Sequence, residues 1–271
     1  MLGGSARALY LFAWLAGCPD TGGFEVVPPV DAGVDARSPE ADAGPGTDSG
    51  PATDAGPDGA VACTEPLLRC TRSCDGLFDS VLLEPDFASF PSSLRVAAGT
   101  VRVEGGELVF ERDSSESFSS VSTQGQYSDA LLCARIRMPG GGEGVSLNMF
   151  AVGWLTGSGG VELFLEGRNE QVTFHSLEVL PDGVLLGRRD HVWEADHEFL
   201  VLAWFSGEDA YAEVFDTTMD VAFALRGTYR GEPPPALGWL SATEPKLLEP
   251  VRLQRLVIGI PSGDALAVMQ R

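Results

Sequence analysis

The sequence predicts an all-β sandwich domain, preceded by a signal peptide and a disordered linker. From about Leu77 to Gly263 the chain consists of short alternating or apolar runs separated by Gly, Pro, Asp and Ser. Many short strands without long amphipathic helices are typical of two packed antiparallel sheets. Roughly 185 residues are enough for a large core between two sheets. We therefore assign residues 77–271 to one β-sandwich.

The strand predictions depend on alternation of apolar and polar residues, or on short apolar runs bounded by turn residues. The candidate strands include Thr100–Val103, Glu107–Glu111, Ser119–Thr123, Ala130–Met138, Val145–Leu155, Val161–Glu166, Gln171–Leu180, Phe199–Phe205, Tyr211–Phe215 and Val251–Ile260.

Residues 1–17 resemble a bacterial lipoprotein signal peptide. An apolar run from Ala8 to Ala16 follows Arg7 and leads into Leu15-Ala16-Gly17-Cys18. The run is far shorter than the roughly 20 residues that span a bilayer, and small residues precede the cysteine. The alternative, a buried core helix, has no neighbouring segment to pack against. We expect Cys18 to be lipidated, which anchors the protein at the bacterial cell envelope, in the outer membrane or at the cell surface.

Residues 18–62 form a low-complexity segment of Asp, Ala, Gly and Pro. Such a composition buries too little apolar surface to offset the entropy of ordering, so we predict a disordered tether. Its reach as a flexible coil is on the order of 35 Å. The alternative, a calcium-binding repeat, requires a strict period, whereas Asp31, Asp42 and Asp54 begin irregularly spaced near repeats.

The charge of the chain excludes most nucleic-acid binders. The net charge is −21, and the part from Gly76 onward carries 14 Lys and Arg against 28 Asp and Glu. An acidic surface of this kind repels phosphate backbones. No phosphate-binding glycine loop is present either, because no helix pattern follows the glycines at 140–144. We expect no nucleic-acid partner, no cofactor and a monomeric protein.

Four cysteines remain after Cys18, and they predict two disulfides in an oxidising compartment. Cys63, Cys70 and Cys74 lie close together in a lead-in segment, residues 63–76, whereas Cys133 lies in a predicted strand. Three pairings remain open, although the clustering favours one local bridge and one bridge to Cys133. A zinc site is the alternative. The chain has no CxxC pair, and its histidines lack metal-site spacing to the cysteines, so we expect no metal.

The predicted strand Val161–Glu166 places two carboxylates on one face. Successive side chains of a strand point to opposite faces, so Glu162, Phe164 and Glu166 share one face while the valine and leucines between them face the core. A solvated face is the usual environment of alternating glutamates. A bare phenylalanine between them is unusual there unless it meets a ligand or a covering loop. Two carboxyl groups in one cleft are also the minimal apparatus for cleaving a glycosidic bond.

The order of motifs supports a comparison with one enzyme family. A strand ending in Arg and Pro is followed by a glycine-rich turn, a strand ending near Trp, and the glutamate strand. These segments, with the strands after them, are Tyr127–Pro139, Gly140–Gly144, Val145–Leu155, Glu162–Gly167, Gln171–His175, His197–Trp204 and Tyr211–Asp216. The order resembles glycoside hydrolase family 16, the laminarinase and lichenase group. The resemblance implies a concanavalin A-like jelly roll with a sugar cleft on one concave sheet.

The chain departs from this family at its catalytic motif, Glu-x-Asp-x-Glu. The resemblance implies that Glu162 is the nucleophile and Glu166 the acid/base, but Phe164 stands where the family has the Asp between them. Four residues of strand span about 13 Å between Cα atoms, whereas retaining enzymes need carboxyl groups about 5 to 5.5 Å apart. The ring occupies the space between them, and it is expected to desolvate both carboxylates.

The same resemblance places several aromatic side chains in the cleft. We expect Phe150, Trp154, Phe164, His175 and Trp239 to contact a ligand, since sugar rings stack on aromatic faces. Each aromatic residue taken alone is more often a core residue, and the apolar run around Trp204 predicts core packing for that indole.

We interpret the chain as a lipid-anchored jelly-roll module with a decayed catalytic site that binds a polysaccharide without cleaving it. Two alternatives remain. One is a retaining β-glucan hydrolase that uses Glu162 and Glu166. The other is a structural or protein-interaction module, since fold does not fix function. Hydrolysis of β-glucans by the protein would distinguish the first alternative from simple binding. A concave sheet face that is flat or filled would favour the second.

Overall fold

The computed structural model describes residues 66–111, 118–139, 149–157, 159–166, 170–177, 184–193, 197–231, 234–243 and 250–271. The predictions for the signal peptide, Cys18, the tether and Cys63 lie outside these ranges. Within them, no helix has the length and apolar character needed to cross a membrane.

The described residues contain fifteen strands and two short helices. The strands are β1 (Phe78–Leu83), β2 (Leu94–Ala98), β3 (Thr100–Glu104), β4 (Glu107–Glu111), β5 (Phe118–Tyr127), β6 (Leu131–Met138), β7 (Met149–Leu155), β8 (Gly160–Glu166), β9 (Gln171–Ser176), β10 (Val184–Asp190), β11 (His197–Ser206), β12 (Asp209–Asp216), β13 (Val221–Thr228), β14 (Ala236–Thr243) and β15 (Val251–Pro261). The helices are α2 (Leu67–Thr71) and α3 (Gly263–Met269).

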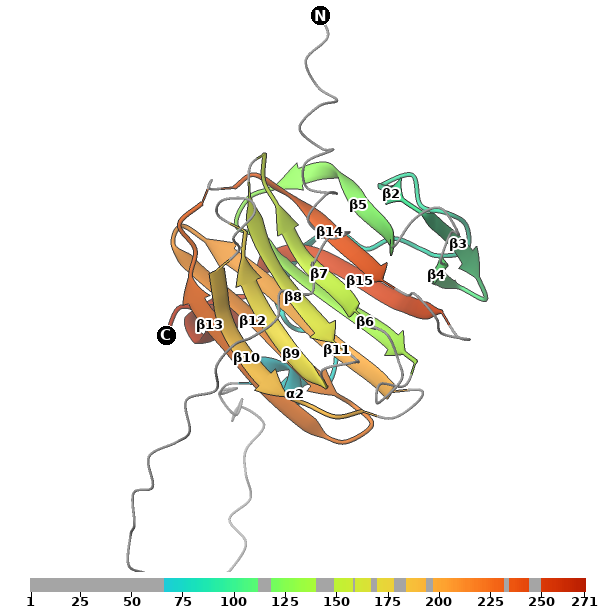
Figure 1. The fold of residues 1–271 in the computed structure, drawn as a ribbon. Coiled ribbons are helices and arrows are strands. Elements are labelled where there is room, and N and C mark those ends of the chain that lie inside the picture. Colours follow the sequence, from blue (N-terminus) through green and yellow to red (C-terminus); the bar gives the residue numbers. More distant parts are fainter. Residues whose placement is uncertain are drawn as a thin grey trace, which may run out of the picture.

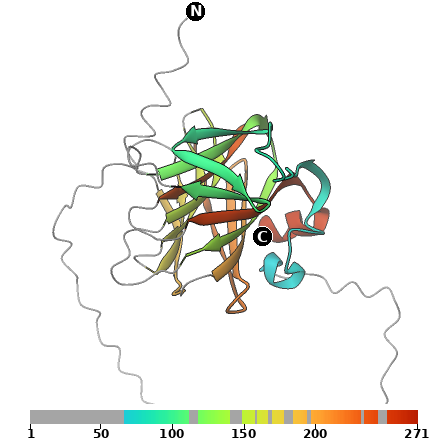
Figure 2. The ribbon, with the colours of Figure 1, turned by 90° about the vertical axis from the view of Figure 1, so that its right-hand side faces the viewer.

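The strands form two antiparallel sheets that pack face to face (Figures 1 and 2). Sheet A has the order β13-β12-β11-β6-β15-β4-β3, with β1 also paired to β15, and sheet B has the order β10-β9-β8-β7-β14-β5-β2. Neighbours in space are often distant in sequence, as where β14 lies between β5 and β7. The predicted all-β sandwich is confirmed.

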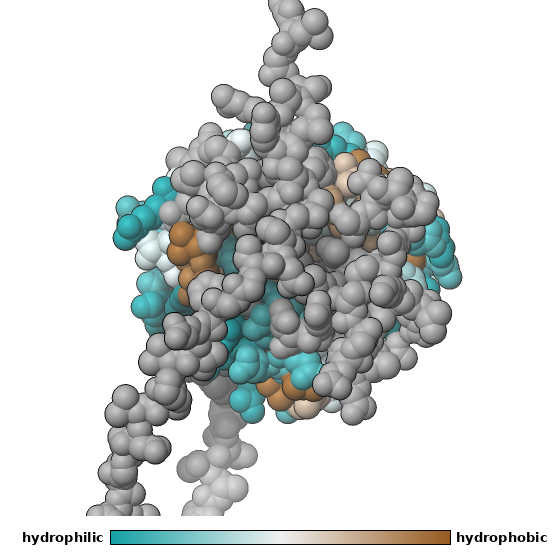
Figure 3. Space-filling view, in the orientation of Figure 1, coloured by the Kyte–Doolittle hydropathy of each residue, from teal (hydrophilic) through white to brown (hydrophobic). Residues whose placement is uncertain are grey.

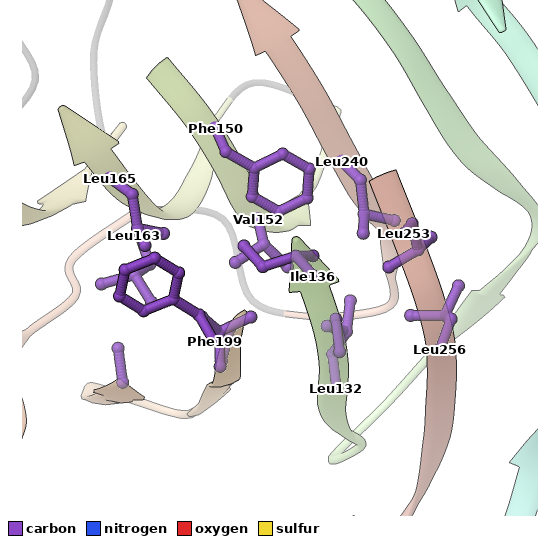
Figure 4. Packing of buried hydrophobic residues seen from close by; sticks show 14 of the residues in the cluster. Leu132, Ile136, Phe150, Val152, Leu163, Leu165, Phe199, Leu240, Leu253 and Leu256 are labelled. Atoms are coloured by element: carbon purple, nitrogen blue, oxygen red, sulfur yellow. The ribbon is translucent and has the colours of Figure 1, made fainter. Parts of the chain in front are cut away.

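The main core lies between the sheets, where alternate side chains of each strand interdigitate (Figure 4). On β7 these are Phe150, Val152 and Trp154. The Trp154 indole Nε1 donates a hydrogen bond of 2.9 Å to the carbonyl oxygen of Ala203 on β11. This indole therefore links sheet B to sheet A while its ring fills the space between them.

The helices α2 and α3 lie against the outer side of sheet A (Figure 2). A second apolar cluster beneath them covers part of this face. Trp204 is buried in this cluster, on the outer side of sheet A, so its predicted core packing is confirmed. The carboxylate of Glu213 on β12 accepts hydrogen bonds from the backbone amides of Leu67 and Leu68 at 2.6 and 2.8 Å, and so satisfies two free N–H groups at the start of α2.

A disulfide joins Cys74, just after α2, to Cys133 on β6. It confirms the predicted bridge from the cysteine cluster to Cys133. The predicted local bridge involves Cys63, which lies outside the described residues, and Cys70 is exposed on α2. α2, α3 and the disulfide cover one part of the outer face of sheet A, whereas Arg135 and Arg137 on the same face of β6 are exposed.

Candidate functional site

The glutamate strand β8 lies in the middle of sheet B, between β7 and β9 (Figure 1). The valine and two leucines that alternate with its polar residues belong to the main core. Glu162 and Phe164 therefore point to the outer face of sheet B, together with Glu166, as the alternation predicts. Both Glu162 and Phe164 are 5% exposed, so this outer face is not an ordinary solvated surface.

The expectation that Phe150 and Trp154 face the ligand is wrong, because both belong to the main core. In the β7–β8 register Phe150 lies opposite Leu165 and Trp154 lies opposite Val161, so both rings share the inner face with the apolar residues of β8. Figure 4 shows Phe150 among these core residues. Large and small residues alternate along β7. The large rings fill the core, and the outer face carries Ala151 and Gly153 instead.

One row of side chains crosses the outer face of sheet B through directly opposed residues. It runs from Ser122 on β5 to Trp239, Gly153, Glu162 and His175 on β14, β7, β8 and β9. A Cβ atom at Gly153 would collide with the carbonyl oxygen of Val161, so the close approach of β7 and β8 requires glycine there. As a result, no side chain stands between Trp239 and Glu162, whose backbones are about 10 Å apart across two strand spacings.

A second row lies one pleat further along the same face. It consists of Ser120, Ser241, Ala151, Phe164 and Thr173 on the same five strands. The Phe164 ring packs against the neighbouring His175 ring of the first row, with centroids 5.3 Å apart in an edge-on arrangement. The two rows together place two aromatic rings and a carboxyl group around the gap at Gly153.

Glu162 is the most perturbed acid of this face. Burial raises the pKa of its carboxyl from 4.5 to about 7, and no hydrogen bond or charge from the described residues offsets the loss of solvent. The group therefore changes protonation near neutral pH. A buried carboxyl with such a pKa, lying on an outer face, is a candidate for a functional group.

Glu166 has a different environment at the end of β8. Its carboxylate accepts hydrogen bonds from Gln171 Nε2 at 2.7 Å and Thr173 Oγ1 at 2.8 Å. Desolvation lowers the pKa of His175, and the charge of Glu166 only partly opposes this shift, so the imidazole stays neutral at physiological pH. The face thus combines one hydrogen-bonded carboxylate, one buried carboxyl without partners and one neutral imidazole.

Two buried polar atoms of this face lack hydrogen-bond partners among the described residues. They are Trp239 Nε1 and Ser120 Oγ. Ser120 lies two residues from Ser122, which is opposite Trp239, so the two groups are diagonal neighbours on adjacent strands. A buried polar group left unsatisfied costs about 1 to 3 kcal/mol, and a ligand that supplies a partner recovers this free energy.

The sequence analysis named Trp239 but missed Ser120. The run Ser119-Ser120-Val121-Ser122 contains a usable signal, because the serines that flank a core valine at alternate positions must face outward.

Seen from the side of sheet B, hydrophilic surface of the described residues is visible over the sheet (Figure 3).

A buried His–Asp–His cluster was also missed. The Asp216 Oδ2 atom lies 3.0 Å from His191 Nε2 and 2.9 Å from His197 Nδ1, and Asp216 Oδ1 accepts hydrogen bonds from the amides of Thr218 and Met219. The cluster ties the segment between β10 and β11 to the end of β12. The described residues hold no group of three or more His, Cys, Asp or Glu arranged to bind a metal ion.

Comparison with known proteins supports the fold. The sequence matches no protein-family model and no curated protein. The CBM2 module of the evolved Dit of Lactobacillus casei BL23 phage J-1 aligns with a TM-score of 0.51 at 12% identity, over 67% of this chain and 96% of that one. Lectin II from Ulex europaeus aligns with a TM-score of 0.50 at 7% identity, over 66% of this chain and 99% of the lectin.

A third similar structure was described with endo-acting O-glycanases of the human gut microbiota. It aligns with a TM-score of 0.51 at 10% identity, over 68% of this chain and 100% of that chain. At these identities the three similarities concern the fold alone. The chain has a lectin-like jelly-roll sandwich, which agrees with the fold that the sequence resemblance implied.

Proposed function

We propose that the outer face of sheet B binds a glycan and does not cleave it. The observation that carries the proposal is the pair of buried, unpartnered polar atoms on this face, Trp239 Nε1 and Ser120 Oγ. A sugar hydroxyl can accept from the indole N–H and can donate to or accept from the serine hydroxyl. Phe164 and Trp239 lie on the same face as these two atoms, and aromatic rings are side chains that pack against the CH faces of sugars.

The similar structures support the same proposal through their shared architecture. One is a CBM2 module and another is a lectin. Sites with few well-placed polar groups among apolar side chains are typical of small-molecule binding. Glu162, Phe164, His175 and Trp239 meet this description, because all four lie on one face and three of them are at least nine-tenths buried.

The state of the two glutamates argues against hydrolysis by the family 16 mechanism. That mechanism needs an ionised nucleophile at the position of Glu162, but burial raises its pKa to about 7. It also needs an acid/base at the position of Glu166 that is free to reach the substrate, but the carboxyl oxygens of that residue already accept hydrogen bonds from Gln171 and Thr173. Loss of the intervening Asp typically costs several kcal/mol of transition-state stabilisation, or roughly 10²-fold in rate.

A β-glucan hydrolase is the second candidate function, and one observation favours it. A carboxyl with a pKa of about 7 is suited to act as a general acid at neutral pH. Release of reducing ends from laminarin or mixed-linkage glucan, lost in Glu162→Gln, would support this candidate over the non-catalytic one.

Binding of immobilised glycans by the full-length chain tests the first proposal. We expect Trp239→Phe to weaken retention on a glycan array by about tenfold, because an aromatic ring is kept but the N–H is lost. Trp204→Phe is the matched control, since its indole Nε1 is also buried without a partner but lies on the outer face of sheet A. Equal losses in both variants would contradict the proposed site.

We also propose that the domain is displayed at the cell envelope through lipidated Cys18. The support is the signal-peptide pattern of residues 1–17. Cys18→Ala should move the protein from the membrane fraction to the soluble fraction and should abolish labelling with a radioactive fatty acid. Unchanged labelling in this variant would contradict the anchor.

A further inference from the structure

Glu162, near the centre of the outer face of sheet B, has no hydrogen bond or ion pair to the other described residues, and burial is the only cause of its raised pKa. A cation placed beside this carboxyl would stabilise its ionised form, whereas a sulfate or carboxylate group would oppose ionisation. The site therefore favours positive charge in a ligand.

The basic side chains of this face stand on its outer strands. Arg95 on β2 donates to Ser122 Oγ at 2.8 Å, and Arg188 on β10 lies opposite Thr173. Asp190, also on β10, adds a third carboxylate opposite Gln171. His175 faces Glu162 directly, but its pKa is lowered by desolvation, so it supplies no charge at neutral pH.

The groups around the Gly153 gap match the recognition chemistry of an ammonium ion. Glu162 and Phe164 are alternate residues of β8 on one side of the gap, and Trp239 stands on the other side. Aromatic faces attract cations, most strongly when both are desolvated, and Phe164 and Trp239 are 5% and 6% exposed. A carboxylate flanked by two aromatic rings provides both parts of such a site.

We infer that the bound glycan carries a free primary amine, as in a deacetylated amino sugar, and that its ammonium group pairs with Glu162 beside Phe164 and Trp239. The inference rests on the proposed glycan-binding face and names the class of sugar that this face selects. Neighbouring hydroxyls of the same sugar satisfy Trp239 Nε1 and Ser120 Oγ, the two unpartnered atoms of the face. The acidic chain, with a net charge of −21, draws such a cation toward it.

The test compares three oligomers of equal length by calorimetry with the full-length chain: a β-1,4-linked glucosamine tetramer, its N-acetylated form and cellotetraose. We expect the glucosamine tetramer to bind at least about tenfold more tightly than the other two, because only it pairs with the buried carboxylate. Glu162→Gln should remove this preference. Glu208→Gln is the matched control, since it makes the same chemical substitution in the exposed β11–β12 turn.

A second measurement does not depend on any variant folding. At about pH 6 Glu162 is mostly protonated, so pairing with the amine should release close to one proton, measured from binding heats in buffers of different ionisation enthalpy. No proton release with the glucosamine tetramer would overturn the inference, as would a preference for the amine that survives Glu162→Gln.

The two proposals fail in different ways. Equal affinity for all three oligomers, weakened by Trp239→Phe, would overturn the amine and leave glycan binding in place. Absence of binding by all three, together with an unreactive glycan array, would overturn both.

Discussion

Phe164 and His175 pack edge to face on the outer face of sheet B, with ring centroids 5.3 Å apart. The phenyl ring also stands between Glu162 and Glu166 on β8, where the family 16 motif has an Asp. The neutral imidazole and the apolar ring together keep water and charge from the space between the carboxyl groups.

This contact predicts that the protein releases no reducing ends from laminarin or mixed-linkage glucan. Phe164→Asp should lower the free energy of unfolding by about 3 kcal/mol or more, because it loses the ring and buries a third carboxylate. Phe164→Leu, which keeps an apolar side chain, should cost less. The measurements are a reducing-sugar assay and chemical denaturation, and turnover by the unmodified protein that disappears in Glu162→Gln would contradict the prediction.

Stability should fall as pH rises from about 4.5 to about 7, through the raised pKa of Glu162. The folded state binds a proton in this window that the unfolded state has released, so deprotonation favours unfolding by on the order of 3 kcal/mol. Glu162→Gln removes this contribution. Denaturation at about pH 5 and pH 8 should show a smaller difference for Glu162→Gln than for the unmodified protein or for Glu208→Gln. Identical pH dependence in all three proteins would show that Glu162 is not the titrating group.

The two tryptophans at opposite faces of sheet B should respond differently to substitution. Trp154→Ala should lower the free energy of unfolding by about 3 to 5 kcal/mol, because it leaves a cavity between the sheets and removes the hydrogen bond to Ala203. Trp239→Phe should cost clearly less, because a phenyl ring still fills most of the site and the lost N–H has no partner among the described residues. Thermal and chemical denaturation measure both, and a large loss in Trp239→Phe would show that its indole has a structural partner.

The His–Asp–His cluster should stabilise the folded state, and this stabilisation should be lost at low pH. Burial raises the pKa of Asp216, but hydrogen bonds from His191, the Met219 amide and His197 outweigh it and leave the pKa below 3.8. The stabilisation from this group is therefore present above about 3.8 and is lost as pH falls through the lower folded-state pKa. Asp216→Ala should cost about 3 to 5 kcal/mol at neutral pH. Asp209→Ala, at the exposed start of β12, is the control and should cost less than about 0.5 kcal/mol.

The disulfide should stabilise the domain by about 2 to 4 kcal/mol. Cys74→Ala and Cys133→Ala remove the same bond, so each should lower the free energy of unfolding, and the double variant should cost little more than the more damaging single one. Strictly additive losses would show that the two residues contribute separately rather than through their bond.

The period of two along β8 was sufficient to predict which of its side chains face outward, because an aliphatic residue stands at every second position and the two glutamates mark the other face. The same reasoning failed on β7. Alternation divides that strand into two sets, but only the size contrast between Phe150 and Gly153 indicates which set fills the core, and the resemblance suggested the opposite assignment.

Other features had no local signal in the sequence. The strands β1, β2, β10 and β13 have mostly exposed or half-buried side chains, so no clear apolar pattern predicts them. In β14, Gly238 breaks the pattern between Leu237 and Trp239. The unpartnered Ser120 and the cluster around Asp216 depend on contacts between strands that are far apart in the chain. Their burial follows from the sheet topology, which sequence periodicity does not contain.

The Cys74–Cys133 bond also determines how the domain carries mechanical load. A force applied through the chain that precedes α2 first acts on that short helix and its hydrogen bonds to Glu213. Once α2 detaches, the covalent bond transfers the tension to Cys133 on β6, which is held between β11 and β15 inside sheet A. The oxidised domain therefore resists traction at an interior strand of the sheet, on the layer opposite the proposed glycan face. When the disulfide is reduced, the tension acts on β1, the strand that follows Cys74. Among the described strands β1 pairs with β15 alone, so it should be the first strand to detach from sheet A.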